Sequence, residues 1–304
     1  MSYFTPALIE EATQHLKTVQ DWLRFGASQF EKAELTYGHG QDDPWMEAGV
    51  LLLDVLHLTP DYLPDILKTK LLPTERAALI ELYEKRIFER IPAAYLIKKA
   101  WFAGMDFYVD ERVLVPRSPL AEWIERSFEP FLEPGQVLRI LDLCTGSACI
   151  ACACAQYFPD AQVDAVDISV DALTVAKKNV ERHGLGDRVR LIQSDLFAAL
   201  TEKNCYDLII SNPPYVADTV VAGLPKEYQH EPSLGLAAGQ EGLDFALPIL
   251  DHAAEYLTPE GVLVVEVGYS NAALEEARPD LPFLWLDFER GGEGVFLLTA
   301  DQLS

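Results

Sequence analysis

The short stretch Asn212-Pro213-Pro214-Tyr215 carries groups that could hold and aim a planar amino group. A nitrogen attached to an sp² carbon is a poor nucleophile, because its lone pair is delocalised. The side-chain oxygen of Asn212 and the carbonyl of Pro213 could accept its hydrogens, and both oxygens favour the positive charge that develops as the nitrogen attacks. The ring of Tyr215 offers a surface for a planar group. We therefore predict Asn212, Pro213 and Tyr215 as catalytic residues, and these three together with Pro214 as substrate-binding residues.

The same stretch stands where a predicted strand must end. The apolar run Leu208-Ile209-Ile210 indicates a short buried strand, and two consecutive prolines cannot donate hydrogen bonds to a sheet. The stretch would then lie at the carboxyl end of a strand, where open α/β sheets bind ligands. A plain turn is the alternative, since Asn-Pro and Pro-Pro are common in turns.

Acidic side chains end three further predicted strands. Asp142 ends the first, Asp167 the second and Asp195 the third. An acid about 20 residues past a glycine turn is the ribose ligand of nucleoside-binding sheets, and Asp167 stands at that spacing from Gly146. The alternative is that each acid only caps the loop or helix that follows it.

The acids and the turn together predict a nucleoside cofactor without a pyrophosphate, because the turn contains only Gly146 and not G-x-G-x-x-G. Carboxylates suit a cationic nucleoside such as S-adenosylmethionine, with its amino group and sulfonium. Acids at successive strand ends, followed by the Asn212 corner, favour this interpretation over simple capping. The candidate cofactor-binding residues are Asp142, Cys144, Thr145, Gly146, Asp167, Ile168, Asp195, Leu196 and Asn212.

The overall charge bears on the choice of partner. The chain has 304 residues, of which 48 are acidic and 24 basic, with a formal net charge of −24 and a pI of about 4.5. An acidic surface repels phosphate backbones, so DNA is not expected as a partner and a basic protein is favoured. No apolar run approaches the roughly 20 residues of a membrane span, and the first residues lack the pattern of a signal peptide. We therefore expect a cytoplasmic protein without a membrane partner.

The five cysteines, an odd number, fit a reducing compartment. Cys149 and Cys152 form a C-x-x-C pair, which raises metal or redox chemistry as an option. No second pair follows in the sequence, no histidine stands nearby, and alanine and isoleucine surround the pair. We therefore predict buried thiols on a helix and no metal site.

Apolar periodicity divides the chain into three parts. Residues 1–96 show helical spacing, including one helical face from Thr5 to about Phe30, and are predicted to form a helical substrate-recognition domain. Residues 97–117 show the alternation of a β-hairpin that includes 113–115, and are predicted to connect two domains. Residues 118–304 are predicted to form the catalytic domain.

Strands and helices alternate in that third part. This order indicates an α/β fold with a mostly parallel sheet and right-handed crossovers. Two last apolar runs, 283–288 and 295–298, flank Gly291-Gly292 and predict a closing antiparallel hairpin.

The motifs resemble those of a known family. Asp142-Leu-Cys-Thr-Gly146-Ser, Asp167, Asp195 and Asn212-Pro-Pro-Tyr215 are together similar to the class I, Rossmann-like methyltransferases that modify glutamine side-chain amides. The resemblance covers nearly the whole chain, including Arg90-x-Pro92-x-x-Tyr95. It implies S-adenosylmethionine as the donor and direct in-line transfer of its methyl group to an amide nitrogen.

Two branches of that family differ after the hairpin. Release-factor enzymes carry Pro-Arg-Pro-Asp/Glu-Thr-Glu, whereas this chain has Pro116-Arg117-Ser118-Pro119-Leu120-Ala121-Glu122. The latter resembles the branch that methylates a glutamine of large-subunit (50S) ribosomal protein three, L-3, which is therefore the expected partner. One departure is Ala148, where the family usually has a glycine that allows close helix–strand approach.

Three alternatives remain open at this point. The first is methylation of peptide chain release factors by the sister branch. The second is methylation of an adenine amino group in a nucleic acid, against which the acidic composition argues. The third is a noncatalytic S-adenosylmethionine-binding factor for ribosome assembly, against which the intact Asn212 argues.

Overall fold

The computed structural model describes residues 3–303 and separates into two compact units. Unit 1 runs to Lys99 and also includes Pro225–His230, whereas unit 2 consists of Ala100–Leu224 and the chain from Glu231 onward. The two-stranded hairpin of β1 (Ala100–Phe102) and β2 (Met105–Phe107) belongs to unit 2. Its predicted continuation through 113–115 is wrong, because that segment is loop.

Unit 1 is helical, and its apolar faces enclose one core. The single helical face expected from Thr5 to Phe30 is divided between two helices. The break follows from Thr18, whose hydroxyl accepts from the backbone N–H of Asp21 while the Asp21 carboxylate accepts from the N–H of Thr18; this capping box starts a new helix. The helices are α1 (Pro6–His15), α2 (Val19–Lys32), α3 (Pro44–Leu56), α4 (Leu63–Ile66), α5 (Pro73–Phe88) and α6 (Ala93–Ile97).

The segment Pro225–His230 joins unit 1 through buried ion pairs. Glu227 accepts a hydrogen bond from the Thr36 N–H at 3.1 Å and lies 3.3 Å from both Arg86 and Arg90. Arg86 also pairs with the buried Glu47. Each buried charge therefore has a counter-charge, without which its burial would be strongly unfavourable.

Unit 2 is built on a seven-stranded sheet in the order β5-β4-β3-β6-β7-β9-β8. The first five are parallel, while β9 runs antiparallel to both β7 and β8, which confirms the predicted mostly parallel sheet with a closing hairpin. The strand order reverses between β3 and β6, and this switch point is where such sheets bind ligands. The strands are β3 (Arg139–Leu143), β4 (Gln162–Asp167), β5 (Val189–Gln193), β6 (Tyr206–Ser211), β7 (Leu257–Glu266), β8 (Leu284–Trp285) and β9 (Val295–Thr299).

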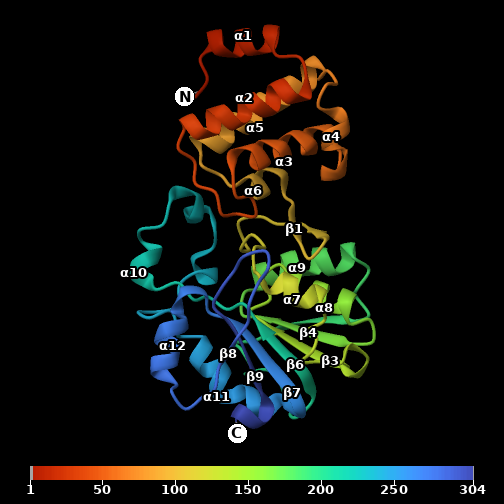
Figure 1. Ribbon diagram of the computed structural model, residues 1–304, viewed down its shortest axis with the longest axis vertical. Helices are drawn as coiled ribbons and strands as arrows, with labels where there is room; N and C mark the ends of the chain where they lie inside the picture. The colour runs from red at the N-terminus through yellow and green to blue at the C-terminus, as the bar shows by residue number, and fades with distance from the viewer. Residues whose placement is uncertain (1–2, 304) are drawn as a thin grey trace. The chain divides into compact units, whose positions relative to one another are not determined.

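Helices cover both faces of this sheet (Figure 1). Alternate strand residues face opposite cores, so that Ile140 packs with α8 and its neighbours while Leu141 packs with α11. The buried cysteines Cys149, Cys152 and Cys154 lie on α8, as predicted. The helices of unit 2 are α7 (Leu120–Glu125), α8 (Cys149–Tyr157), α9 (Val170–Arg182), α11 (Ala246–Tyr256) and α12 (Asn271–Ala277), which pack on the sheet, and α10 (Asp218–Val221), which contributes to neither core.

Across residues 3–303, every helix is too short or too polar to cross a membrane. The same residues contain no group of three histidine, cysteine, aspartate or glutamate side chains placed to hold a metal ion.

Candidate active site

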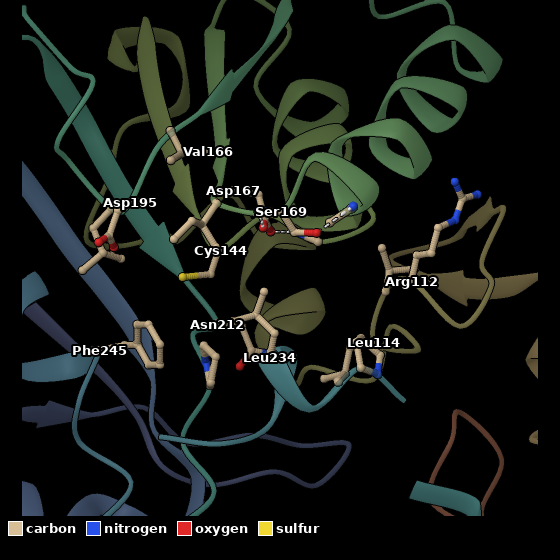
Figure 2. A pocket seen from close by; sticks show the side chains of 18 of the residues that line it. Arg112, Leu114, Cys144, Val166, Asp167, Ser169, Asp195, Asn212, Leu234 and Phe245 are labelled. Atoms are coloured by element: carbon tan, nitrogen blue, oxygen red, sulfur yellow. Dashed lines mark hydrogen bonds between the residues drawn. The ribbon is translucent and has the colours of Figure 1, made fainter. Parts of the chain in front are cut away.

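A cavity lies where β3, β4, β5 and β6 end, and most of the predicted site residues line it (Figure 2). Its walls also come from two loops and from the residue before α11. The sequence-predicted residues on its walls are Cys144, Gly146, Asp167, Ile168, Asp195, Leu196, Asn212 and Pro214. The structure thus brings two of the three strand-end acids, Asp167 and Asp195, together with the amide of Asn212 around one cavity.

Asp167 is held in a fixed orientation at the end of β4. Its Oδ2 accepts from the backbone N–H of Gly146 at 2.8 Å, and its Oδ1 accepts from the N–H of Ser169 at 2.8 Å. Ser169 in turn caps α9 by accepting from the N–H of Ala172. Burial raises the pKa of Asp167, and these backbone donors oppose that rise. The carboxylate therefore both shapes the turn and faces the cavity.

Asp142 and Thr145 lie behind the cavity wall and shape the turn after β3. Asp142 is fully buried, and its Oδ2 accepts from the Thr145 hydroxyl at 2.5 Å and from the Ala151 N–H at 3.1 Å. Its Oδ1 has no hydrogen-bond partner among residues 3–303. Burial raises the pKa of Asp142 to about 7, against the lowering effect of its two donors. A cation or donor brought near this turn would favour the ionised form.

Ala148 stands at a backbone conformation that usually requires glycine. Its φ is +63° and ψ is +24°, in the left-handed region, and its side chain is fully buried at the start of α8. The sequence alone suggested only a crowding problem for the methyl group. The structure shows that backbone strain is the larger consequence, because Cβ disfavours this region.

The four predicted substrate-binding residues, Asn212-Pro213-Pro214-Tyr215, take different positions relative to the cavity. Asn212 and Pro214 line the cavity, whereas Pro213 is buried outside its lining. Ser211, which precedes them, donates from Oγ to the Leu143 carbonyl at 2.8 Å and so ties the end of β6 to the end of β3. The Tyr215 hydroxyl donates to Glu266 at 3.0 Å and is not directed to the cavity wall.

Several wall residues were not predicted from sequence. Phe245 closes one side of the cavity, and Leu234 and Leu114 come from two separate loops (Figure 2). The Arg112 guanidinium points away from the other labelled side chains and pairs with Asp110. Loop residues carry no periodic signal; the position of Phe245 just before an amphipathic helix was the one available indication.

The residues that line the cavity fit S-adenosylmethionine. The carboxylates of Asp167 and Asp195 suit polar and cationic groups, and Ile168, Leu196 and Phe245 supply apolar surface for a planar base. A Cβ at Gly146 would meet no heavy atom within 4 Å, so the turn leaves open space beside Asp167. These residues could hold the nucleoside against the corner that carries Asn212.

Comparison with known proteins identifies the family of the chain. The family model described as the methyltransferase small domain matches residues 130–224. The ribosomal protein uL3 glutamine methyltransferase of Neisseria meningitidis serogroup A is 48% identical over 97% of this chain and 97% of its own length. The protein of the same name from Neisseria gonorrhoeae is 48% identical over 97% of this chain and 99% of its own.

Among solved structures, the catalytic domain of hMettl16 in complex with a MAT2A 3'UTR hairpin is 18% identical. It covers 73% of this chain and 80% of its own, with a TM-score of 0.50, and supports the methyltransferase fold alone. The identity to the Neisseria proteins extends over both units, from the helices to the closing hairpin. The chain therefore belongs to the family of the ribosomal protein uL3 glutamine methyltransferases.

Proposed function

We propose that this protein transfers a methyl group from S-adenosylmethionine to the side-chain amide nitrogen of a glutamine in ribosomal protein uL3. The observation that carries the proposal is the position of Asn212 on the wall of a cavity whose other walls include Asp167 and Asp195. The identity of 48% to uL3 glutamine methyltransferases over nearly the whole chain supports the choice of acceptor.

The residues divide into two groups by role. Asp167 would bind the ribose hydroxyls, and Asp195, Ile168, Leu196 and Phe245 would hold the base. S-adenosylmethionine would supply a methyl group whose carbon is already a good electrophile, because its bond to the cationic sulfur breaks to leave a neutral thioether.

On the acceptor side, the Asn212 side-chain oxygen and the Pro213 carbonyl would accept the two amide hydrogens and aim the nitrogen. These oxygens also favour the positive charge that develops on the nitrogen, whose proton leaves after transfer. The enzyme therefore acts mainly by positioning.

The charge of the protein supports a basic acceptor. Unit 2 contains 32 acidic and 12 basic residues, whereas unit 1 contains 16 and 12, so most of the negative charge is on the catalytic unit. An acidic enzyme attracts a basic, unassembled ribosomal protein and repels nucleic acid. We propose unit 1 for recognition of the protein, because the cavity alone selects only an amide, and the cytoplasm as the place of the reaction.

The test offers labelled S-adenosylmethionine and three acceptors in parallel: free uL3, a class I release factor and duplex DNA. Label should enter uL3, on one glutamine located by mass spectrometry, and added salt should slow the transfer. Preferential labelling of the release factor would move the protein to the sister branch. Labelling of DNA would refute the argument from charge, and tight cofactor binding without any labelling would indicate a noncatalytic assembly factor.

A further inference from the structure

A set of buried polar residues lies behind the segment Asn212–Tyr215. The methyl transfer proposed above assigns these residues no role. Glu266 is the last residue of β7 and is 4% exposed. It lies next to the corner, because Ser211 pairs with Val265 in the parallel sheet. The Glu266 carboxylate accepts from two hydroxyls, Oη of Tyr215 at 3.0 Å and Oγ of Ser118. Ser118 and Glu266 both lie outside the lining of the cavity.

The Ser118 hydroxyl has a defined direction. Its Oγ accepts from the backbone N–H of Leu120 at 3.1 Å, which leaves the hydroxyl proton for Glu266. The preceding Arg117 is fixed by two hydrogen bonds to Glu231, at 2.5 and 2.8 Å. Burial raises the pKa of Glu266, while Ser118, Tyr215 and the charge of Arg117 all lower it. Two hydroxyl donors and one nearby cation thus support an acid that would otherwise be isolated in the interior.

Tyr215 is held at three points. Its hydroxyl is bound by Glu266, and its carbonyl accepts from Oγ of Ser270 at 3.1 Å. Its ring lies directly over Gly268, where a Cβ would come within 2.6 Å of ring carbon Cε2. Only two residues, both prolines with restricted φ, separate this ring from Asn212. The restricted φ of the two prolines limits how far the ring and the Asn212 amide can move independently.

We propose that Glu266 and Ser118 are positioning residues for the methyl acceptor. Glu266 anchors the Tyr215 hydroxyl, Ser118 orients Glu266, and the stiff Pro213-Pro214 pair carries this placement to Asn212. The proposal rests on the methyl transfer proposed above and adds residues that touch neither the cofactor cavity nor the acceptor. It assigns the Tyr215 hydroxyl to this anchor and leaves only its ring for the substrate.

The kinetic test uses Tyr215→Phe, Glu266→Gln and the double variant, with uL3 as acceptor. Tyr215 donates to Oε1 of Glu266 and Ser118 to Oε2, so a glutamine, which has an NH2 group in place of one of these oxygens, loses at least one of the two bonds. Each single variant should lower kcat/KM by about tenfold to hundredfold, the effect of losing a hydrogen bond to a charged group. The double variant should be no worse than the poorer single variant, because both changes interrupt the same series of contacts from Ser118 through Glu266 to Tyr215. Cofactor affinity, measured by calorimetry, should stay within about threefold of the wild type.

Ser118 supplies a finer test. Ser118→Ala should lower kcat/KM by up to about tenfold, and Ser118→Thr, which keeps the hydroxyl, should restore most of it. Ser127→Ala removes a hydroxyl from unit 2 that donates to the Tyr157 carbonyl, and it should leave turnover unchanged. Additive losses, or a loss of cofactor affinity in step with turnover, would show that these residues have only a structural role and would refute the proposal.

A second measurement needs no acceptor. The same double-mutant cycle, run on unfolding by urea, should show that the effects of Tyr215→Phe and Glu266→Gln on stability are coupled. If the wild type fails to label uL3 while this coupling is present, the proposed function is wrong and the anchor stands. If the wild type labels uL3 and both variants turn over normally, the positioning role is wrong and the function stands. Absence of coupling in unfolding would contradict the anchor itself.

Discussion

Gly146 and Asp167 are joined by a hydrogen bond of 2.8 Å from the glycine N–H to the aspartate Oδ2. The turn after β3 and the end of β4 are therefore held together, although the two positions are 21 residues apart in the sequence. The carboxylate that faces the cavity is oriented before any ligand arrives. Such preorganisation reduces the entropy that binding must otherwise cost.

Asp167→Ala should weaken S-adenosylmethionine binding strongly. The change removes the proposed hydrogen bonds to the two ribose hydroxyls, each worth about 1.5–3 kcal/mol, and it also frees the Gly146 turn. Titration calorimetry measures the dissociation constant, with the exposed Asp160→Ala as a control. An unchanged dissociation constant in Asp167→Ala would show that the acid is only a cap.

Asn212→Ala should act on turnover more than on cofactor binding. We expect a loss of roughly 10²–10³ in kcat, the usual effect of removing one preorganised polar contact. Single-turnover labelling of uL3 measures the rate, and calorimetry should show nearly unchanged cofactor affinity. Asn271→Ala, outside the cavity lining, is the matched control. Normal turnover of Asn212→Ala would show that the segment Asn212–Tyr215 is only a turn.

Ala148→Gly should stabilise the protein. The left-handed conformation at φ +63° costs alanine roughly 1–2 kcal/mol, part of which glycine loses again as chain entropy, so a gain of up to about 1 kcal/mol is expected. Urea unfolding measures it, and cofactor affinity should stay within a few-fold. Ala153→Gly, inside α8, should instead destabilise by about 1 kcal/mol. A rise in cofactor affinity of several orders of magnitude in Ala148→Gly would mean that the methyl group obstructs the site.

Asp142 should make stability depend on pH. Its pKa of about 7 in the folded protein exceeds the ordinary value of 3.8, so the folded state binds its proton more tightly than the unfolded state. The resulting stabilisation is complete below the unfolded pKa and is lost as pH rises toward 7, by roughly 4 kcal/mol in total. Asp142→Asn cannot ionise, so its stability relative to the wild type should increase between pH 5 and pH 8.

Urea unfolding of the cofactor-free protein at several pH values tests this expectation. Asp160→Asn, at an exposed turn, should differ from the wild type by a constant amount over the same range. A constant difference for Asp142→Asn as well would show that this acid is already ionised in the folded state.

Local patterns in the sequence were enough to predict several parts of the protein. Strands were predictable from apolar runs, the start of α9 from the capping residue Ser169, and the cavity from acids at successive strand ends. The motif around Asn212 then indicated the chemistry. Each of these signals works over a few residues, because hydrogen bonding and side-chain periodicity within one element produce it.

Contacts between segments far apart in the sequence could not be predicted in this way and depend on how the elements pack. The Tyr215 hydroxyl donates to Glu266, which is 51 positions further along the chain. Glu227 pairs with Arg86, which is 141 positions before it. The left-handed backbone of Ala148 likewise became apparent only in the folded chain. A buried acid needs some partner to offset the loss of its hydration, but no local pattern tells which hydroxyl or guanidinium the packed sheet and helices will bring to it.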